Sequence, residues 1–521
     1  MSYINTISRR DFLSRSLRVG AGLGLAALTR VPPFACRALA EGNIGLNGKK
    51  LLFISIRGAN DALNSCIPVK DDGFTSVIRP NIWIPQGASS LYSETTGGCE
   101  FPTGLASTFA HSNALSLRNG FAGLHPSLKF LAPVYNAGEL LLVHRVGYPN
   151  QSRSHFDSQA YWENGEPNNT SREGIFYRTL VESGVLAANP IAGISIQSAL
   201  PTIFKGSGAA LTNIADPTRY ELLGTPTPTA DQKLMNSILN GNQALFANKR
   251  SRELLRLSYG NLSSTLDLFS TVDFEETGNT FTDDVATDGG SAHYSLFPTS
   301  AANNGDGVNA ATQVVDSGAY SFFEQLKAAA LILNKTDAVI AGTEMNGFDT
   351  HDNQGSTTGD HANLLSRVGW AIYALRKYFQ QNGDKVSWNN LVVVTLTEFG
   401  RTTAQNSNNG TDHAEAGMML VAGGNVKGTG KAGRTSGVIG CGTSDSIPWT
   451  TGPSGSMFGV AGRYLQRAVD YRSVLGEVIR EHLGATQNQL NSIIPGYVTE
   501  NLLGGGVAPD ATQIMGEVDV V

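Results

Sequence analysis

Apolar residues form several continuous runs along the chain, and polar residues follow each run. Such runs are typical of strands that are covered on both faces of a parallel sheet. Stretches with helical spacing lie between them, for example at 317–334 and 364–381. The alternation predicts an α/β fold with a mainly parallel central sheet. The predicted strands cover residues 49–55, 139–147, 191–196, 338–342, 391–397 and 418–423.

The polar loop between the last two predicted strands carries Glu398, Arg401, Asp412 and His413. Parallel sheets bind ligands beyond their strand ends, so a carboxylate after one strand and an Asp-His pair before the next indicate a metal site. Asp349 and His351 follow the strand at 338–342. In an extended backbone, side chains two residues apart point to the same side. We therefore predict that this second pair converges on a cation.

Residues that follow two other predicted strands are further candidates for the metal site. Asp61 follows the first strand, although it also fits an ordinary turn residue of the segment Gly-Ala-Asn-Asp. Ser152, Arg153 and Ser154 come after the strand at 139–147 and before a predicted helix at 156–163. A hydroxyl at a helix start lies near the positive end of the helix dipole, where an anion is favoured. A simple helix N-cap is the alternative for either serine.

The amino-terminal segment has the features of a twin-arginine export signal. SRRDFL precedes a Gly/Ala/Leu-rich run at 19–28, and Ala38 and Ala40 provide a cleavage site before Glu41. This run is short for a bilayer span, although an uncleaved membrane anchor is the alternative. We therefore expect a signal at 1–40, the twin-arginine translocase as export partner, a periplasmic or extracellular protein, and no stable membrane insertion.

Charge and composition narrow the possible functions. The chain has 38 basic and 44 acidic residues; without residues 1–40, which hold six Arg and one Asp, these become 32 and 43, a net charge of −11. So acidic a protein is not expected to bind nucleic acid. We expect one domain over 41–521, with an insertion or cap at 171–312 that includes a mobile linker. The three cysteines after residue 40 show no metal-binding spacing.

The candidate residues favour hydrolysis assisted by metal ions. Two cations about 4 Å apart polarise an ester oxygen and lower the pKa of a hydroxyl or water. Carboxylates mixed with imidazoles suit zinc, manganese, magnesium or calcium. Arg153 and Arg401 would then hold the remaining oxygens of a phosphate or sulfate.

Six motifs resemble those of the exported bacterial domain-of-unknown-function 1501 family, and the resemblance covers nearly the whole mature chain. They are, in order, RGANDALN, LHPSL, NQSRSHFDSQAYW, GFDTHDNQ, TEFGRT and DHAEAG. That family looks like a branch of the alkaline phosphatase-like superfamily, which includes sulfatases. The resemblance implies an α/β/α sandwich with a two-metal site around a serine or threonine nucleophile. By motif, Asp61 resembles the first metal aspartate, Ser154 the nucleophile and His413 the late metal histidine.

The chain departs from the superfamily pattern at two places. Asp349 and His351 are two residues apart, whereas the superfamily pair is separated by four. Glu398 and Phe399 stand where the superfamily has Asp-His. These departures leave open a single metal or an oxygen-rich pair, and Ser152 remains a rival nucleophile.

We therefore predict a metal-dependent hydrolase that acts on a phosphate or sulfate ester of a small molecule or a polysaccharide. The alternative is a non-catalytic exported protein that binds a carbohydrate or a protein partner on the same fold.

Overall fold

The structure, a computed structural model, describes five main parts of the chain, with short gaps inside them. These are residues 44–90, 112–216, 294–304, 313–449 and 464–521, together with the short pieces 265, 272–274 and 282–283. The predicted export signal at 1–40 lies outside the described residues, as do Cys36 and Cys99.

A nine-stranded mixed sheet forms the centre of the described part. Its strand order is β14-β6-β13-β12-β1-β11-β7-β8, and β15 also pairs with β6. The strands are β1 (Lys50–Ile56), β6 (Leu140–Gly147), β7 (Gly193–Ile196), β8 (Thr212–Ile214), β11 (Ile340–Met345), β12 (Leu391–Leu396), β13 (Gly417–Ala422), β14 (Val438–Ile439) and β15 (Val469–Asp470). Short strands outside this sheet are β2 (Cys66–Ile67), β3 (Gln86–Ser90), β4 (Ala114–Ser116), β5 (Gly123–Leu124), β9 (Thr282–Asp283), β10 (Tyr294–Ser295), β16 (Gly506–Val507) and β17 (Gln513–Ile514).

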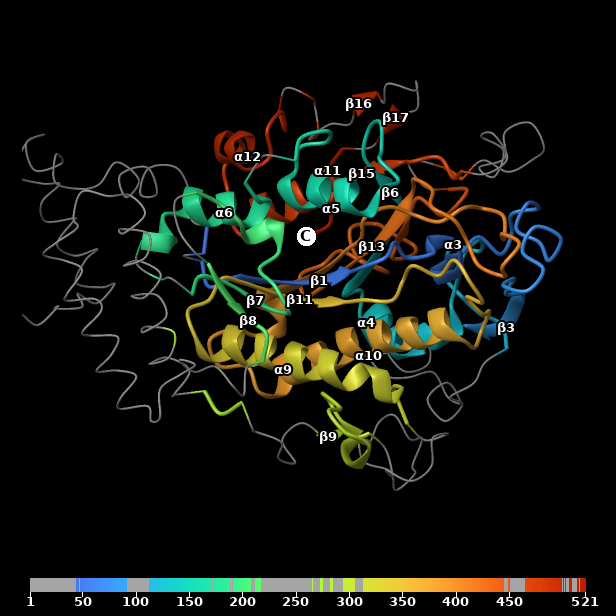
Figure 1. The fold of residues 1–521 in the computed structure, drawn as a ribbon, viewed down its shortest axis with the longest axis horizontal. Helices are drawn as coiled ribbons and strands as arrows, with labels where there is room; N and C mark the ends of the chain where they lie inside the picture. Colours follow the sequence, from blue (N-terminus) through green and yellow to red (C-terminus); the bar gives the residue numbers. More distant parts are fainter. Residues whose placement is uncertain are drawn as a thin grey trace, which may run out of the picture.

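Helices cover both faces of the sheet. Figure 1 shows α9 and α10 on one side of β1, β7 and β11, with α5, α6, α11 and α12 on the other. The α-helices are α3 (Ala62–Ser65), α4 (Ala132–Asn136), α5 (His155–Asn164), α6 (Ile175–Ser183), α9 (Tyr320–Lys335), α10 (Asp360–Gln381), α11 (Tyr471–Glu477) and α12 (Gln487–Ile493). A 3-10 helix, η2 (Pro126–Leu131), leads into α4, and a π-helical turn, η12 (Val478–His482), continues α11.

Strand β1 is mostly apolar because its two faces pack against different apolar clusters. Leu52 and Ile54 belong to the apolar cluster that contains the residues of α9 and α10, whereas Leu51 and Phe53 belong to the cluster on the opposite face. All four side chains are fully buried. The predicted α/β architecture with a mostly parallel sheet is therefore confirmed, and the apolar runs of the sequence mark its strands.

The direction of one strand differs from the prediction. Strand β12 pairs in parallel with β1, but β13 pairs antiparallel with both β12 and β6. The prediction that 418–423 forms a parallel strand was wrong, because a run of apolar residues reads the same in either direction. The carboxyl ends of β1, β6, β11 and β12 consequently share one edge with the amino end of β13.

Part of the range predicted as an insertion, 171–312, belongs to the central sheet. Strand β7 pairs with β11, and β8 pairs with β7. Strands β7 and β8 therefore belong to the central sheet, and most of the remainder up to 312 lies outside the described residues. Cys66 and Cys441 are both fully buried. Within the part of the chain that the structure describes, every helix is too short or too polar to cross a bilayer.

Candidate metal centre

Three imidazoles and a carboxylate meet at the shared edge of the sheet. His155 is the first residue of α5, which follows β6. Asp349 and His351 follow β11, and His413 lies in the loop between β12 and β13. The four residues come from three segments that are far apart in the sequence. The sheet topology is what brings them together.

Their side-chain atoms approach to the distances of a coordination shell. His413 Nε2 lies 3.0 Å from His155 Nε2 and 2.9 Å from His351 Nε2. Asp349 Oδ1 lies 3.4, 3.1 and 3.3 Å from the Nε2 atoms of His155, His351 and His413. Tetrahedral ligands at about 2.0–2.1 Å from a zinc ion are separated from one another by about 3.3 Å. The separations among these residues therefore fit a metal site.

His155, Asp349 and His413 form the compact part of this cluster. Their ligand atoms all lie within 4.8 Å of one another. His351 contacts two of the three, and its Nε2 also lies 3.5 Å from Arg401 Nη1. We therefore take the compact three as the primary ligand set and His351 as an additional ligand beside it.

The second nitrogen of each imidazole contacts an acceptor. His155 Nδ1 lies 2.6 Å from Glu398 Oε2, and His413 Nδ1 lies 2.8 Å from the carbonyl oxygen of Arg153. A carbonyl or ionised carboxylate only accepts hydrogen bonds, so each Nδ1 carries the hydrogen and each neutral Nε2 presents a lone pair. Facing lone pairs repel unless a proton or metal ion lies between them. Carboxylate or carbonyl partners behind metal-bound histidines orient the rings in this way.

His351 follows the same rule with Asp412. Its Nδ1 lies 3.2 Å from Asp412 Oδ1, which also accepts a hydrogen bond from Asn406 Nδ2 at 3.0 Å. The sequence hypothesis made Glu398 and Asp412 direct ligands. In the structure these two carboxylates contact the outer nitrogens of His155 and His351 instead.

The charges of the cluster are consistent with cation binding. Burial alone would raise the pKa of Asp349, but the hydrogen bond and ion pair with Arg401 bring this pKa to about 2. The hydrogen bond to Glu398 raises the pKa of His155, whereas burial lowers the pKa of His413. Asp349 is therefore ionised at neutral pH and available as a ligand.

Arg401 holds the cluster from inside the protein. Its side chain is fully buried and forms an ion pair with Asp349. Its Nε donates to the Ala59 carbonyl oxygen and its Nη1 to that of Thr411, and Nη2, the nitrogen that pairs with Asp349, also contacts the carbonyl oxygens of Gly58 and Phe348. The hypothesis gave Arg401 the role of holding substrate oxygens. The structure places it as a buried support for Asp349.

Two residues shape the walls of the centre. The ring of Phe399 is fully buried and lies 4.8 Å, centroid to centroid, from the rings of both His155 and His413. Gly58 has φ +105°, and a Cβ there would lie 2.4 Å from the backbone nitrogen of Asp349. Its N–H donates to the Glu398 carboxylate at 3.1 Å. Only glycine fits this close approach of the β1 turn to the ligand loop.

Ser154 is the N-cap of α5, and its hydroxyl accepts a hydrogen bond from the Asp157 N–H at 3.5 Å. The Ser152 hydroxyl accepts from the Ser154 N–H at 3.1 Å. The guanidinium carbon of Arg153 lies 4.9 Å above the ring of Tyr464. Ser154 and Arg153 are exposed beside the histidine cluster. This geometry agrees with the capping alternative and leaves the predicted nucleophile role of either serine as a prediction.

Asp61 lies outside the cluster. Its carboxylate is fully buried and pairs with Arg79 Nη1 at 2.7 Å. It also accepts hydrogen bonds from Gln354 Nε2 at 2.7 Å and from the Leu63 N–H at 3.2 Å. Burial alone would raise the pKa of Asp61, but the paired Arg79 lowers it. The structure does not bring Asp61 to the position of a metal ligand, because its oxygens face these donors.

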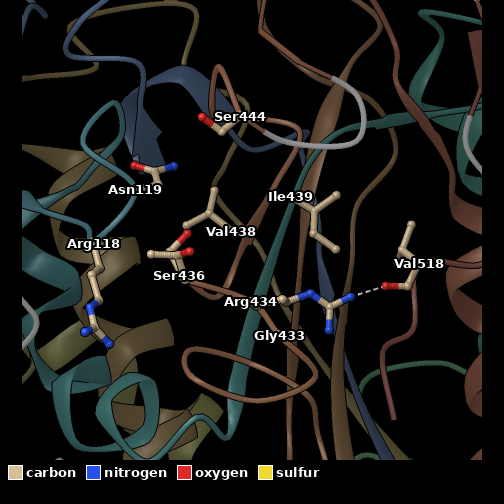
Figure 2. A pocket seen from close by; sticks show the side chains of 10 residues that line it. Arg118, Asn119, Gly433, Arg434, Ser436, Val438, Ile439, Ser444 and Val518 are labelled. Atoms are coloured by element: carbon tan, nitrogen blue, oxygen red, sulfur yellow. Dashed lines mark hydrogen bonds between the residues drawn. The ribbon is translucent and has the colours of Figure 1, made fainter.

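One cavity of the described structure is lined by residues outside the cluster. A cavity of about 330 Å³ is lined by residues that include Arg118, Asn119, Arg434, Ser436 and Ile439. Figure 2 shows the Arg434 guanidinium turned toward the carbonyl oxygen of Val518, to which it donates. The described residues that line this cavity include no carboxylate and no imidazole. The histidine cluster is therefore the better candidate for chemistry.

Comparison with known proteins gives one match. Residues 284–442 match the family described as Protein of unknown function (DUF1501). The match supports the resemblance of this chain to the DUF1501 family. The matched segment includes Asp349, His351, Asp412 and His413, whereas His155 precedes it. No curated protein and no solved structure gives a significant match.

Sequence reasoning missed His155 as a ligand. Its partner His413 is 258 positions further along the chain. Locally it resembles an ordinary polar residue at a helix start, because no histidine or carboxylate follows three or four residues later, the spacing that places two side chains on one face of a helix. The available signal was its position directly after the loop that follows β6, next to Ser154.

Proposed function

We propose that this protein is an exported, metal-dependent hydrolase of phosphate or sulfate esters. The observation that carries the proposal is the convergence of His155, His413 and Asp349, whose ligand atoms lie 3.0 to 3.4 Å apart. Two imidazoles and one carboxylate fit zinc better than magnesium or calcium, which prefer oxygen ligands. His351 offers a third nitrogen. When bound, the metal supplies Lewis acidity that stabilises negative charge on an ester oxygen.

The residues around the cluster have separate roles in this proposal. Ser154 is the nucleophile at the start of α5, where the helix dipole favours the anionic group under attack. Its hydroxyl oxygen forms a bond to phosphorus or sulfur as the bond to the alcohol breaks, and water later releases the group. The exposed Arg153 guanidinium contacts the remaining oxygens. Ser152 is the competing nucleophile.

Placement in the alkaline phosphatase-like superfamily is part of the same proposal. It is supported by the helices on both faces of the sheet and by ligands in the loops that follow parallel strands. The absence of Asp61 from the cluster is a difference from the superfamily pattern. The proposal therefore requires at least one metal ion and does not require two.

The test combines metal analysis with turnover. Purified mature protein is stripped with a chelator and reloaded with zinc, manganese, magnesium or calcium. It is then assayed on aryl phosphates and aryl sulfates. We expect at least one bound ion per chain and release of phosphate or sulfate. Bound metal without turnover on any ester would refute the hydrolase and favour the non-catalytic binding protein.

Ser154 needs two substitutions because it is also a helix cap. Asparagine keeps an N-cap acceptor but has no hydroxyl, whereas alanine removes both. If Ser154 is the nucleophile, Ser154→Asn and Ser154→Ala both abolish turnover. An active Ser154→Asn variant together with an inactive Ser152→Ala variant would assign the nucleophile to Ser152.

Export is proposed from the amino-terminal motif. Replacement of both Arg9 and Arg10 by lysine is expected to leave the protein in the cytoplasm of a host with a twin-arginine translocase. Fractionation of cells that produce the full chain gives the measurement. Unchanged appearance outside the cytoplasmic membrane would contradict this route.

A further inference from the structure

A buried polar network lies behind the candidate metal centre, and Asp61 is its central residue. Asp61 and Arg79 are both fully buried and form an ion pair at 2.7 Å. Arg79 also donates to the carbonyl oxygens of Thr402 and Thr403, both at 2.8 Å. Arg79 thus connects the Asp61 carboxylate to the loop that carries His413.

Gln354 connects the same carboxylate to two threonines. Its amide nitrogen donates to Asp61 Oδ2 at 2.7 Å. Its amide oxygen accepts from Thr350 Oγ1 at 3.0 Å and from Thr411 Oγ1 at 2.8 Å. The Asp61 bond leaves the amide only one orientation, because a carboxylate cannot accept from the carbonyl end. The ionised Asp61 therefore dictates which atom of Gln354 faces the threonines.

Both threonines adjoin ligand residues. Thr350 lies between Asp349 and His351, and its side chain is buried whereas those of its two neighbours are partly exposed. Neighbouring residues of an extended segment point in opposite directions, so Thr350 ties the backbone from the side away from the metal. Thr411 is two residues before His413, and its N–H donates to the Thr350 carbonyl oxygen at 3.1 Å.

We infer that Asp61 is a positioning residue that sets metal affinity by holding the two ligand loops in register through Gln354, Thr350 and Thr411. This inference rests on the proposed function, since it concerns the same metal ion. It assigns Asp61 a role without direct coordination. Every polar group in the network is paired, and loss of one hydroxyl would free both loops to shift relative to each other.

Thr411 gives the sharpest test because valine has nearly the same shape and lacks the hydroxyl. The dissociation constant of Zn²⁺ is measured by competition with a chromophoric chelator on the full mature chain. Thr411→Val is expected to weaken Zn²⁺ binding about tenfold, within the range seen for residues behind metal ligands. Thr411→Ser keeps the donor and is expected to restore affinity to near that of the unsubstituted protein.

Thr343→Val is the matched control. Thr343 is buried in β11, and its hydroxyl donates to Gln325 Oε1 at 3.2 Å, the same type of bond outside the network. We expect it to leave the Zn²⁺ dissociation constant unchanged. Equal weakening by Thr343→Val and Thr411→Val would overturn the inference, as would unchanged binding by Thr411→Val.

Asp61→Asn separates positioning from coordination. With Co²⁺ in place of Zn²⁺, this variant is expected to bind more weakly but to show the same absorption bands per bound ion, because the ligand atoms are unchanged. Altered bands together with unchanged Zn²⁺ binding by Thr411→Val would make Asp61 a ligand and overturn the inference. If the substituted chain does not fold, the Thr411 series still decides. Absence of Zn²⁺ binding by the unsubstituted protein would refute the proposed function as well. Tight Zn²⁺ binding that is unchanged in the Thr411→Val variant would refute only the inference.

Discussion

Glu398 offers the most direct test of how the centre is held. Its carboxylate, only 5% exposed, accepts from His155 Nδ1 at 2.6 Å and from the Gly58 N–H at 3.1 and 3.2 Å. Glu398→Gln preserves the shape and removes the charge. A hydrogen bond to a charged group contributes about 1.5–3 kcal/mol and a neutral one about 0.5–1.5 kcal/mol. The difference of about 1–1.5 kcal/mol corresponds to about a tenfold loss of metal affinity.

The assay is a Zn²⁺ competition titration of chelator-stripped protein at pH 7.5, with Glu344→Gln as the matched control. Glu344 is a partly exposed carboxylate that pairs with Arg57 Nε at 3.2 Å and also accepts bonds from Gln197 and Ser198. We expect Glu398→Gln to weaken Zn²⁺ binding about tenfold and Glu344→Gln to leave it unchanged. Equal dissociation constants for Glu398→Gln and the unsubstituted protein would refute the assigned role of Glu398. So would equal losses in both variants.

Three further predictions follow from the same structure. His413→Ala removes a ligand and is expected to weaken Zn²⁺ binding more than a hundredfold in a competition titration, while the metal-free melting temperature changes little. Arg401→Lys leaves Asp349 and several buried carbonyl groups with fewer donors, so a loss of about 3 kcal/mol in urea unfolding is expected. Burial lowers the pKa values of His144 and His482 to about 4; because both are neutral when folded, stability present above pH 6.5 is expected to fall toward pH 4, by about 3 kcal/mol for each group. Urea midpoints at pH 7.5 and 4.5 measure this loss, and equal midpoints would contradict it.

The strands could be predicted from the sequence because both faces of the sheet are covered. Strand β12 reads as a continuous apolar run, and all of its residues are buried. The same logic located Asp349 and His351, since their two-residue spacing in an extended segment places both side chains on one side. The local sequence therefore predicted strand positions and side-chain directions wherever one segment alone determines them.

The roles of Asp61 and Glu398 differ from the sequence prediction because contacts with distant residues determine them. Asp61 stands after a strand like a ligand, but Arg79, 18 positions later, occupies its carboxylate. Glu398 is 243 positions from His155, and nothing local indicates that it orients an imidazole rather than binding a metal directly. A carboxylate looks the same in either role until its partner is known.

The antiparallel direction of β13 explains why the loop between β12 and β13 contributes residues to the metal centre from both of its ends. Because β13 runs antiparallel to β12, the end of β12 and the start of β13 lie at the same edge of the sheet. Glu398 leaves β12 at that edge, and the chain returns through His413, whose backbone forms an antiparallel bridge with Arg401. A parallel β13 would begin at the opposite edge, and the chain would have to cross the sheet after His413. The departure from a fully parallel sheet is thus what allows His413 to meet His155 and Asp349.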